Sequence, residues 1–399
     1  MAPVPLTMIR LSDPTENKAI APVWADPENV TIASLDPHPR RIEFLQTVVL
    51  GGVPQAIHVH GEDAGLPLLL FLHGGPGLPH MPFAHVNADL ARWFLVVNWD
   101  QRGAGKSYSP SLRGAHFSAE QFVSDTHDLI LWLLERFGKS RLVLAGHSWG
   151  SALGAIVASR YPHLVAAFVG LGQVTNLRVA EQMRFQMART LAREQQNRAA
   201  ADALATLGPP PYRSARESDA LERWTCRLTG DCHCPIEDSR FLRLALLSPV
   251  YSWLDLLRIP LGVRLSGRCF WEELFHGIDL FSQVPKLDVP AFFIVGRNDA
   301  VVTHGLVRRY FETLVAPRGK SFITFDHSGH WPQLEEPGCF RSVLTGPVWH
   351  GLRHGFDARS FTCAGWSGRQ PDGDNLDAVT NGADRERSAG VFSTDREAA

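Results

Sequence analysis

Short apolar runs alternate with longer amphipathic stretches along much of the chain. Near the start, residues 41–50 and 53–60 alternate in polarity and are joined by two glycines, a pattern that predicts a β-hairpin. Further along, continuous apolar runs of strand length are typical of parallel strands that are buried on both faces. These runs occupy residues 66–72, 94–99, 141–146 and 165–172, and the strand pattern returns at 289–296 and 320–326. Helical patterns at 118–138 and 151–162 lie between the strands, so the sequence predicts an α/β fold with a mostly parallel, doubly wound sheet.

The hydrophobic pattern of the sequence changes between residues 175 and 285. Helix-forming sequence rich in Arg and Leu replaces the strand pattern there, which indicates a helical cap (175–285) inserted into an α/β core made of 41–174 and 286–345. Residues 1–40 are rich in proline and lack periodicity, so we expect an irregular leader. Residues 346–399 are expected to form a disordered tail, because large apolar side chains become scarce toward its end.

Composition and charge exclude several classes of protein. A hydrophobic fraction of 45% with 20% charged residues is that of an ordinary globular chain, and not of a disordered, collagenous or coiled-coil one. The net charge of −2 offers no electrostatic footprint for nucleic acid or for an anionic membrane, so we expect neither partner. No apolar run approaches the ~20 residues that span a bilayer. Six clustered cysteines, and an N-terminus without the apolar segment of a secretory signal, predict a reducing, cytoplasmic setting.

The strongest chemical signal is Gly146-His147-Ser148-Trp149-Gly150, a G-x-S-x-G motif between a predicted strand and a predicted helix. In this context the serine stands on a strained turn, and small residues must flank it so that the two backbones can approach. The turn lifts the hydroxyl of Ser148 above the strand end and directs the N–H of Trp149 at a developing oxyanion. A chance glycine-rich β-α turn is the simpler alternative, but the strand before and the helix after favour a nucleophile.

A second glycine-rich segment, residues 73–77, directly follows a predicted strand. Acyl transfer needs at least two donors aimed at the oxyanion, and glycines allow a loop to turn its amides inward. Pro76 has no N–H, which leaves the three glycines of the segment as candidates. We favour Gly75 as one oxyanion donor, with Trp149 as the other. A purely structural tight turn is the alternative.

A nucleophilic serine needs a base that is itself oriented by an acid, and after such an elbow the chain order is serine, acid, base. Asp299 and His330 each follow one of the last two predicted strands, so they are the candidate acid and base. His327 is the rival base, although His330 lies deeper in the loop. Asp326 is the rival acid, although it ends its strand and is close to His330 in sequence.

Four features of the sequence resemble the proline iminopeptidase (prolyl aminopeptidase) family of α/β-hydrolases. They are HGGPG at 73–77, DQRGAGKS at 100–107, the GHSWG elbow at 146–150, and the late acid and base. The resemblance covers roughly residues 41–345. It implies an α/β-hydrolase fold in which the insertion is the family's helical cap.

The resemblance also implies a mechanism and the residues that perform it. Ser148, Asp299 and His330 match the family's catalytic triad position by position, and Gly75 and Trp149 match its oxyanion donors. A serine hydrolase of this kind works through an acyl-enzyme and requires neither metal nor cofactor. We therefore expect no cofactor and no metal site.

An aminopeptidase must recognise a free ammonium group, which needs carboxylate partners in a partly desolvated pocket. In the resembling family those carboxylates come from the cap, and here acids and aromatics stand together at Glu222, Trp271, Glu272 and Glu273. We expect release of N-terminal proline or small apolar residues from a small-molecule or short-peptide substrate. Exposed helix charges are the simpler interpretation of any one of these glutamates.

The sequence leaves alternatives open. His147 stands where proline iminopeptidases most often have glycine, and Gly-His-Ser is frequent in esterase-like relatives. A carboxylesterase or lactone hydrolase of the same fold is therefore the alternative function, and a non-catalytic binding protein is a less favoured one. Epoxide and haloalkane hydrolases of related sequence need a carboxylate nucleophile, and Ser148 argues against them. The oligomeric state stays open.

Two further glycine motifs do not fit a nucleotide site. The segment 105–107 would need glycine at position 100 to complete a phosphate-binding loop, and that residue is Asp100. Gly170-Leu-Gly172 begins a dinucleotide fingerprint that Thr175 fails to complete.

Two charged or metal-binding patterns in the cap also have simple interpretations. The spacing of Cys226, Cys232, His233 and Cys234 matches no common zinc arrangement, so reduced loop cysteines are the better interpretation. A group of arginines interspersed with acids indicates a solvated helix face: Arg178, Arg184, Arg189 and Arg193.

Overall fold

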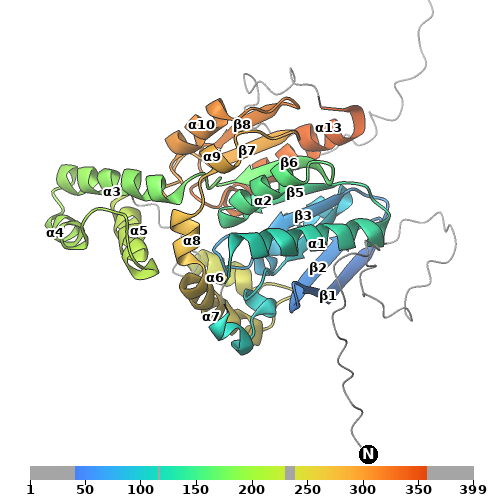
Figure 1. The fold of residues 1–399 in the computed structure, drawn as a ribbon, viewed down its shortest axis with the longest axis horizontal. Coiled ribbons are helices and arrows are strands. Elements are labelled where there is room, and N and C mark those ends of the chain that lie inside the picture. Colours follow the sequence, from blue (N-terminus) through green and yellow to red (C-terminus); the bar gives the residue numbers. More distant parts are fainter. Residues whose placement is uncertain (1–40, 116, 230–238, 357–399) are drawn as a thin grey trace, which may run out of the picture. The chain divides into compact units, whose positions relative to one another are not determined.

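The computed structural model describes residues 41–115, 117–229 and 239–356 (Figure 1). These residues fold around an eight-stranded sheet in the order β1-β2-β4-β3-β5-β6-β7-β8. β2 pairs antiparallel with both β1 and β4, and the remaining pairs are parallel. The mostly parallel, doubly wound sheet of the sequence prediction is therefore confirmed.

Every strand falls on a run that the hydrophobic pattern indicated. The bounds are β1 (Ile42–Leu50), β2 (Val53–Gly61), β3 (Leu68–Leu72), β4 (Leu95–Trp99), β5 (Leu142–His147), β6 (Val165–Leu171), β7 (Ala291–Gly296) and β8 (Lys320–Phe325). β3, β4, β5 and β7 are buried along their whole length, which explains their continuous apolar sequence. Gly51 and Gly52, both with positive φ, form the two-residue turn of the β1–β2 hairpin.

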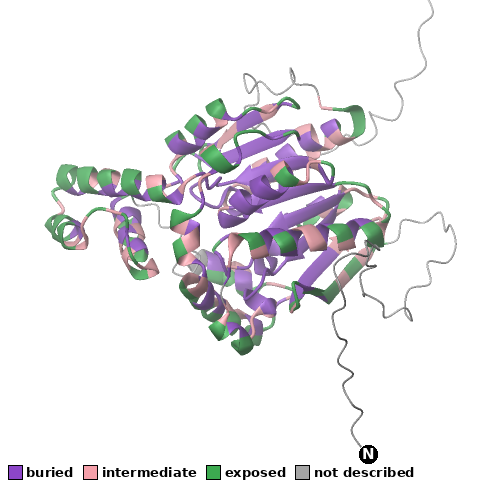
Figure 2. Cartoon of the chain, viewed as in Figure 1, coloured by how far each residue is buried: buried purple, intermediate pink, exposed green. Residues whose placement is uncertain are grey.

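Helices cover both faces of the sheet, and the strands between them are largely buried, with the edge strand β1 the most exposed (Figures 1 and 2). One face packs against α1 (Ala119–Phe137), α2 (Trp149–Arg160) and α10 (His304–Thr313). The other packs against η2 (Met81–Arg92), α12 (Pro337–Val343) and α13 (Trp349–His354). Short helical turns complete the core: η3 (Gly105–Ser107), η4 (Pro110–Gly114), α11 (Pro332–Glu335) and η5 (Leu344–Val348).

Helices occupy most of the described chain between β6 and β7, and we call them the cap. Their bounds are α3 (Leu177–Glu194), α4 (Arg198–Leu207), α5 (Ala215–Thr229), α6 (Ser239–Leu246), α7 (Trp253–Cys269), α8 (Trp271–His276) and α9 (Leu280–Gln283). α3, α4 and α5 pack on one another around a small apolar cluster of their own. α7 packs instead on η3 of the core. The cap thus has two parts with different neighbours.

The helical core continues beyond residue 345, although the sequence predicts a disordered tail from residue 346. η5 and α13 carry the chain to His354, and Val348 is fully buried against the sheet. Trp349 packs edge-on against Trp93 and Phe94. These apolar contacts explain why the helical structure extends this far. Residues 1–40 and 357–399, and three members of the possible zinc pattern at 232–234, lie outside the described residues.

Candidate active site

Ser148 stands on a sharp turn between β5 and α2. Its backbone adopts φ 53° and ψ −122°, a strained conformation for a residue with a side chain, and its side chain is only partly buried. The flanking glycines are sterically required. A Cβ at Gly146 would lie 2.1 Å from the carbonyl oxygen of Gly150, and one at Gly150 would lie 2.2 Å from the carbonyl oxygen of Leu72. This is the local geometry of a nucleophile elbow.

The glycine-rich loop after β3 lies beside this turn. A Cβ added to Gly74 would lie 3.0 Å from the Cβ of Ser148, so the loop and the serine are in direct contact. Gly75 and Gly77 adopt φ of 107° and 85°, which only glycine adopts readily. Trp149 is the first residue of α2, so its N–H has no partner within the helix.

Two buried side chains fix the orientation of this loop. The backbone N–H of Gln101 donates to Nε2 of His73 at 2.9 Å, so Nδ1 carries the imidazole proton and donates to the carbonyl of Gly74 at 2.8 Å. Burial lowers the pKa of His73 to about 4, which keeps the ring neutral in this tautomer. In the trans peptide that follows, the N–H of Gly75 points opposite to the Gly74 carbonyl, away from His73.

Gln101 also connects this loop to the elbow. Its side-chain amide donates to the carbonyl of His73 at 2.9 Å and accepts the indole N–H of Trp149 at 3.1 Å. Both bonds are buried. No sequence pattern identifies Gln101, because its role depends on contacts with two distant segments.

His330 and Asp299 form a buried pair. Nδ1 of His330 lies 2.9 Å from Oδ2 of Asp299, and the other carboxylate oxygen accepts the backbone N–H groups of Val301 and Val302 at 2.8 and 3.0 Å. Burial opposes a charge on Asp299, but His330 and these N–H groups outweigh it and lower the pKa of the carboxyl. Burial also opposes protonation of His330, yet the Asp299 carboxylate raises the pKa of the imidazole above 6.5.

The rival acid and base lie elsewhere. Asp326 is exposed and accepts from Nε of Arg297 at 2.7 Å. The side chain of His327 is exposed too, and its backbone N–H donates to Glu336 at 3.1 Å. The structure thus brings Asp299 and His330 together and leaves both rivals on the surface.

Two residues beside His330 complete its surroundings. Gly172, with φ 50°, approaches the ring so closely that a Cβ there would lie 3.0 Å from Nδ1 of His330. His147 is fully buried, and its Nε2 lies 2.7 Å from the carbonyl oxygen of His330. Burial, together with neighbouring His330, holds the pKa of His147 well below 6.5, so His147 donates as a neutral ring. His147 therefore helps to hold the backbone of His330 in place.

The four cap residues predicted to bind substrate have different surroundings. Glu222 of α5 is partly exposed and lies 3.7 Å from Arg184. Glu273 accepts the backbone N–H of Ala119 at 2.9 Å, at the start of α1. Glu272 is exposed, and Trp271 stacks on Phe275 within the cap. Of these acids, Glu222 is close enough to His330 to influence its pKa.

Two charged side chains on α3 are buried although the sequence pattern gives no sign of it. Arg184, expected on a solvated face, is 2% exposed and donates to the carbonyl of Val301 at 2.6 Å, in the loop that holds Asp299. This carbonyl and Glu222 explain why the arginine points inward. Glu181 is 1% exposed. One of its carboxylate oxygens accepts from the hydroxyl of Ser218, and the other has no hydrogen-bond partner among the described residues.

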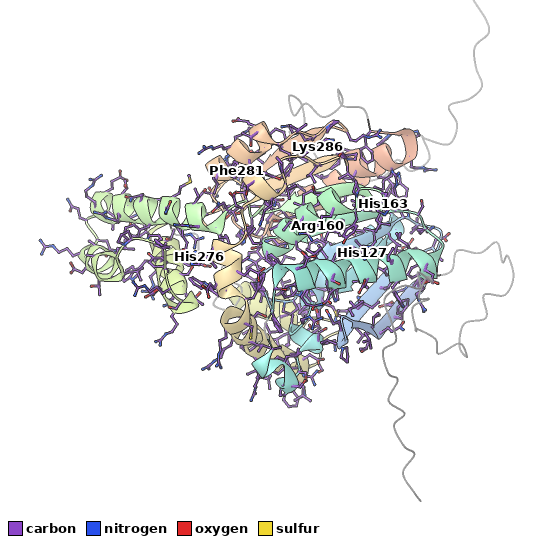
Figure 3. The ribbon with its side chains drawn as sticks, in the orientation of Figure 1. His127, Arg160, His163, His276, Phe281 and Lys286 are labelled. Atoms are coloured by element: carbon purple, nitrogen blue, oxygen red, sulfur yellow. The ribbon has the colours of Figure 1, made fainter. Side chains whose placement is uncertain are left out.

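The groups around Glu181 have opposing effects on its pKa, and the net effect raises it. Burial raises the pKa of this carboxyl, while Ser218, Arg184 and His276 act in the opposite direction. His276 ends α8, a helix that contacts α3 (Figure 3). No position in the sequence pattern distinguishes Glu181 from an ordinary helix glutamate.

Comparison with known proteins places this architecture in a family. The model of the α/β hydrolase fold family matches residues 67–337. The chain belongs to the α/β-hydrolase family. This α/β-hydrolase is 32% identical over 319 residues to the probable aminopeptidase YbaC of Bacillus subtilis (strain 168), a match that covers 79% of this chain and 99% of that protein.

Other similar proteins differ in their chemistry. Epoxide hydrolase A of Mycobacterium tuberculosis is 27% identical over 310 residues, covering 72% of this chain and 91% of that protein. The crystal structure of a proline iminopeptidase from Mycobacterium smegmatis matches with a TM-score of 0.51 at 20% identity, covering 78% of this chain and 98% of that one. The resemblance expected from the sequence is confirmed, and the chain is a hydrolase of the α/β fold.

Proposed function

We propose that this α/β-hydrolase is a serine hydrolase that works through an acyl-enzyme on Ser148. The observation that carries the proposal is the buried His330–Asp299 pair, 2.9 Å apart, in a chain whose elbow serine adopts a strained backbone. The pair occupies Nδ1 of the imidazole, which leaves Nε2 to take the serine proton. An epoxide hydrolase mechanism would need a carboxylate at the elbow, and Ser148 is a serine.

In this mechanism His330 removes the proton from Ser148 as the serine oxygen attacks a carbonyl carbon. The N–H groups of Gly75 and Trp149 stabilise the oxyanion, and Asp299 stabilises the imidazolium that forms. His330 then protonates the leaving group and activates the water that hydrolyses the acyl-enzyme. Nδ1–H of His73 donates to the Gly74 carbonyl and so fixes the orientation of the Gly74–Gly75 peptide. The N–H of Gly75 then points away from His73, which supports its role as an oxyanion donor.

We further propose an aminopeptidase that releases N-terminal proline or small apolar residues. A free ammonium group in a partly desolvated pocket needs carboxylates, and Glu181 offers a buried carboxylate oxygen without a partner among the described residues. Glu222 supplies a second acid near His330. The similarity to a probable aminopeptidase over most of the chain agrees with this substrate class.

The esterase alternative rests on the Gly-His-Ser motif and not on a substrate contact of His147. His147 is buried behind His330 and donates to its carbonyl, so it is not placed as a substrate contact. An ester or lactone substrate would leave the acids at positions 181 and 222 without a function in recognition.

Labelling and a substrate panel test the reaction class. A fluorophosphonate should label the wild-type protein on Ser148, and Ser148→Ala should abolish labelling and lower kcat by more than about 10⁴-fold with little change in melting temperature. Wild-type turnover by the alanine variant would exclude the elbow serine as nucleophile. The panel compares prolyl and alanyl anilides with p-nitrophenyl acetate and a lactone. Fast ester or lactone hydrolysis without anilide release would reject the peptidase and favour the esterase.

A pair of isosteric variants tests ammonium recognition. Glu181→Gln should raise KM for aminoacyl anilides by about tenfold, because it removes the negative charge and keeps the shape, and it should spare simple esters. Glu194→Gln is the matched control, since Glu194 is an exposed glutamate at the end of the same helix, α3. Equal effects of Glu181→Gln on both substrate classes would contradict a role in binding the ammonium group.

A further inference from the structure

Seven large apolar side chains are exposed on two neighbouring cap helices. They are between 43% and 70% exposed, and we call this set the apolar cap face: Leu242, Leu246 and Leu247 on and beside α6, and Trp253, Leu254, Leu257 and Leu261 on α7. Figure 2 shows the exposed positions along α7. Among the described residues, only five other large apolar side chains are comparably exposed, and they are scattered over three other elements and a loop. A concentration of this kind on a globular protein marks an interaction site.

The opposite sides of both helices are fixed, so this face cannot turn inward. On α6, Phe241 and Ala245 pack in a buried cluster with Phe83 and Trp331. On α7, a Cβ at Gly262 would lie 2.7 Å from the carbonyl oxygen of Gly103, which shows how closely the helix lies on the core. The leucines at helical spacing therefore point to solvent as a consequence of the fold.

The charge beside the apolar cap face is positive. The described residues of α6 and α7 contain one acid, Asp255, and it is paired with Lys106 at 2.6 Å and with Arg258 at 3.0 Å. Arg264 and Arg268 are exposed two and three turns after Leu257, and the helical period places them on the same side of α7 as the exposed leucines. The whole-chain charge of −2, from which we expected no membrane partner, averages over this local excess.

These features distinguish between possible partners. In a symmetric dimer the patch faces a second copy of itself. The one acid on the described residues of α6 and α7, Asp255, is already paired, so no carboxylate of these helices would be free to pair with Arg264 and Arg268. An anionic bilayer surface instead satisfies both parts of the face, since it accepts Trp and Leu at the acyl boundary and attracts arginine. None of the described helices is long and apolar enough to cross a membrane, so the contact would be peripheral.

We propose that the apolar cap face docks on the surface of an anionic phospholipid bilayer. α7 lies in the interface, with Trp253 and Leu257 at the acyl boundary and Arg264 and Arg268 among the headgroups. The proposal concerns a surface remote from Ser148 in sequence and chemistry, and it holds whatever substrate the enzyme takes.

Vesicle sedimentation of the full chain tests the proposal without any catalytic readout. The protein should bind vesicles of phosphatidylcholine with phosphatidylglycerol at least tenfold more tightly than vesicles of phosphatidylcholine alone. Arg264→Gln with Arg268→Gln should weaken binding to the anionic vesicles about 25-fold, since each arginine near such a surface contributes about fivefold. Added salt should have a similar effect.

Replacing apolar side chains with serine tests the hydrophobic part of the contact. Trp253→Ser with Leu257→Ser should lower vesicle binding at least tenfold at an unchanged melting temperature. The matched control is Leu45→Ser with Val49→Ser, which removes two side chains of β1 that are 48% and 51% exposed and should leave vesicle binding unchanged.

Three results would overturn the proposal. The first is wild-type protein that binds neither vesicle. The second is a dimer in sedimentation equilibrium that becomes monomeric on Trp253→Ser with Leu257→Ser and binds no vesicle, which would assign the face to a second copy. The third is binding to polyglutamate in place of vesicles, which would assign it to an acidic protein.

Discussion

Replacing Gly172 with alanine should impair the candidate base directly. An added Cβ would lie 3.0 Å from Nδ1, 3.1 Å from Cε1 and 3.1 Å from the carbonyl oxygen of His330. Gly172 cannot easily retreat, because its N–H donates to the carbonyl of Ile294 at 3.0 Å. The imidazole, 2.9 Å from Asp299, must therefore give way.

The size of the effect follows from these distances. An ordinary contact of a methyl group needs about 3.4 Å, so the ring must shift by roughly 0.4 Å. A misplacement of 1 Å can cost about 10²-fold in rate. If the logarithm of the rate falls in proportion to the shift, a displacement of about 0.4 Å lowers kcat by about 5- to 10-fold. The left-handed backbone of an alanine adds about 1 kcal/mol of destabilisation.

Gly138→Ala separates these two effects. Gly138 has φ 62°, yet an added Cβ there meets nothing within 4 Å. Both variants should lose about 2 °C in melting temperature, and only Gly172→Ala should lose kcat, measured on whichever substrate the wild-type enzyme turns over. Equal kcat in the two variants would refute the assignment of His330 as the base that Gly172 supports.

Three other predictions concern pH and the chain end. Because the base must be neutral and Asp299 raises the pKa of His330, kcat/KM should rise with pH with a midpoint above 6.5, and Asp299→Asn should move that midpoint down; an unmoved midpoint would contradict the pairing. Burial lowers the pKa values of His73 and His80 to about 4. The free energy of unfolding should therefore be highest above pH 6.5 and should fall as the pH drops toward 4, by about 2 kcal/mol for each histidine at about pH 5. Urea unfolding at about pH 8 and pH 5 measures this loss, and equal free energies of unfolding would refute it. Deleting residues 367–399 should leave turnover and melting temperature nearly unchanged, and a drop of many degrees would show that this segment packs on the core.

The sheet could be predicted from the sequence because strands buried on both faces leave continuous apolar runs. Ser148, Asp299 and His330 were identifiable because each follows such a run, and parallel strands bring their carboxyl ends together. The geometry of the elbow and of the His330–Asp299 pair agrees with this expectation, while the catalytic roles stay predictions.

Residues whose role depends on packing between distant segments could not be predicted. Arg184 and Glu181 look like any charges on an amphipathic helix, and only the docking of α3 on the loop of Val301 buries them. Gly172 was interpreted as part of an incomplete nucleotide motif, since its closeness to His330 needs the loop after β8. Spacing along a chain gives no information about such contacts.

The contact between α7 and the core limits how substrate can reach Ser148. A Cβ at Gly77 would lie 2.6 Å from the carbonyl oxygen of Gly262 and 2.6 Å from the hydroxyl oxygen of Ser266, so the loop lies directly on the backbone of α7. Lifting α7 away would disturb the segment that carries Gly75. We therefore expect substrate to enter on the side of α3–α5, which pack chiefly on one another. If the proposed aminopeptidase activity holds, movement of those three helices should determine the length of peptide that the enzyme admits.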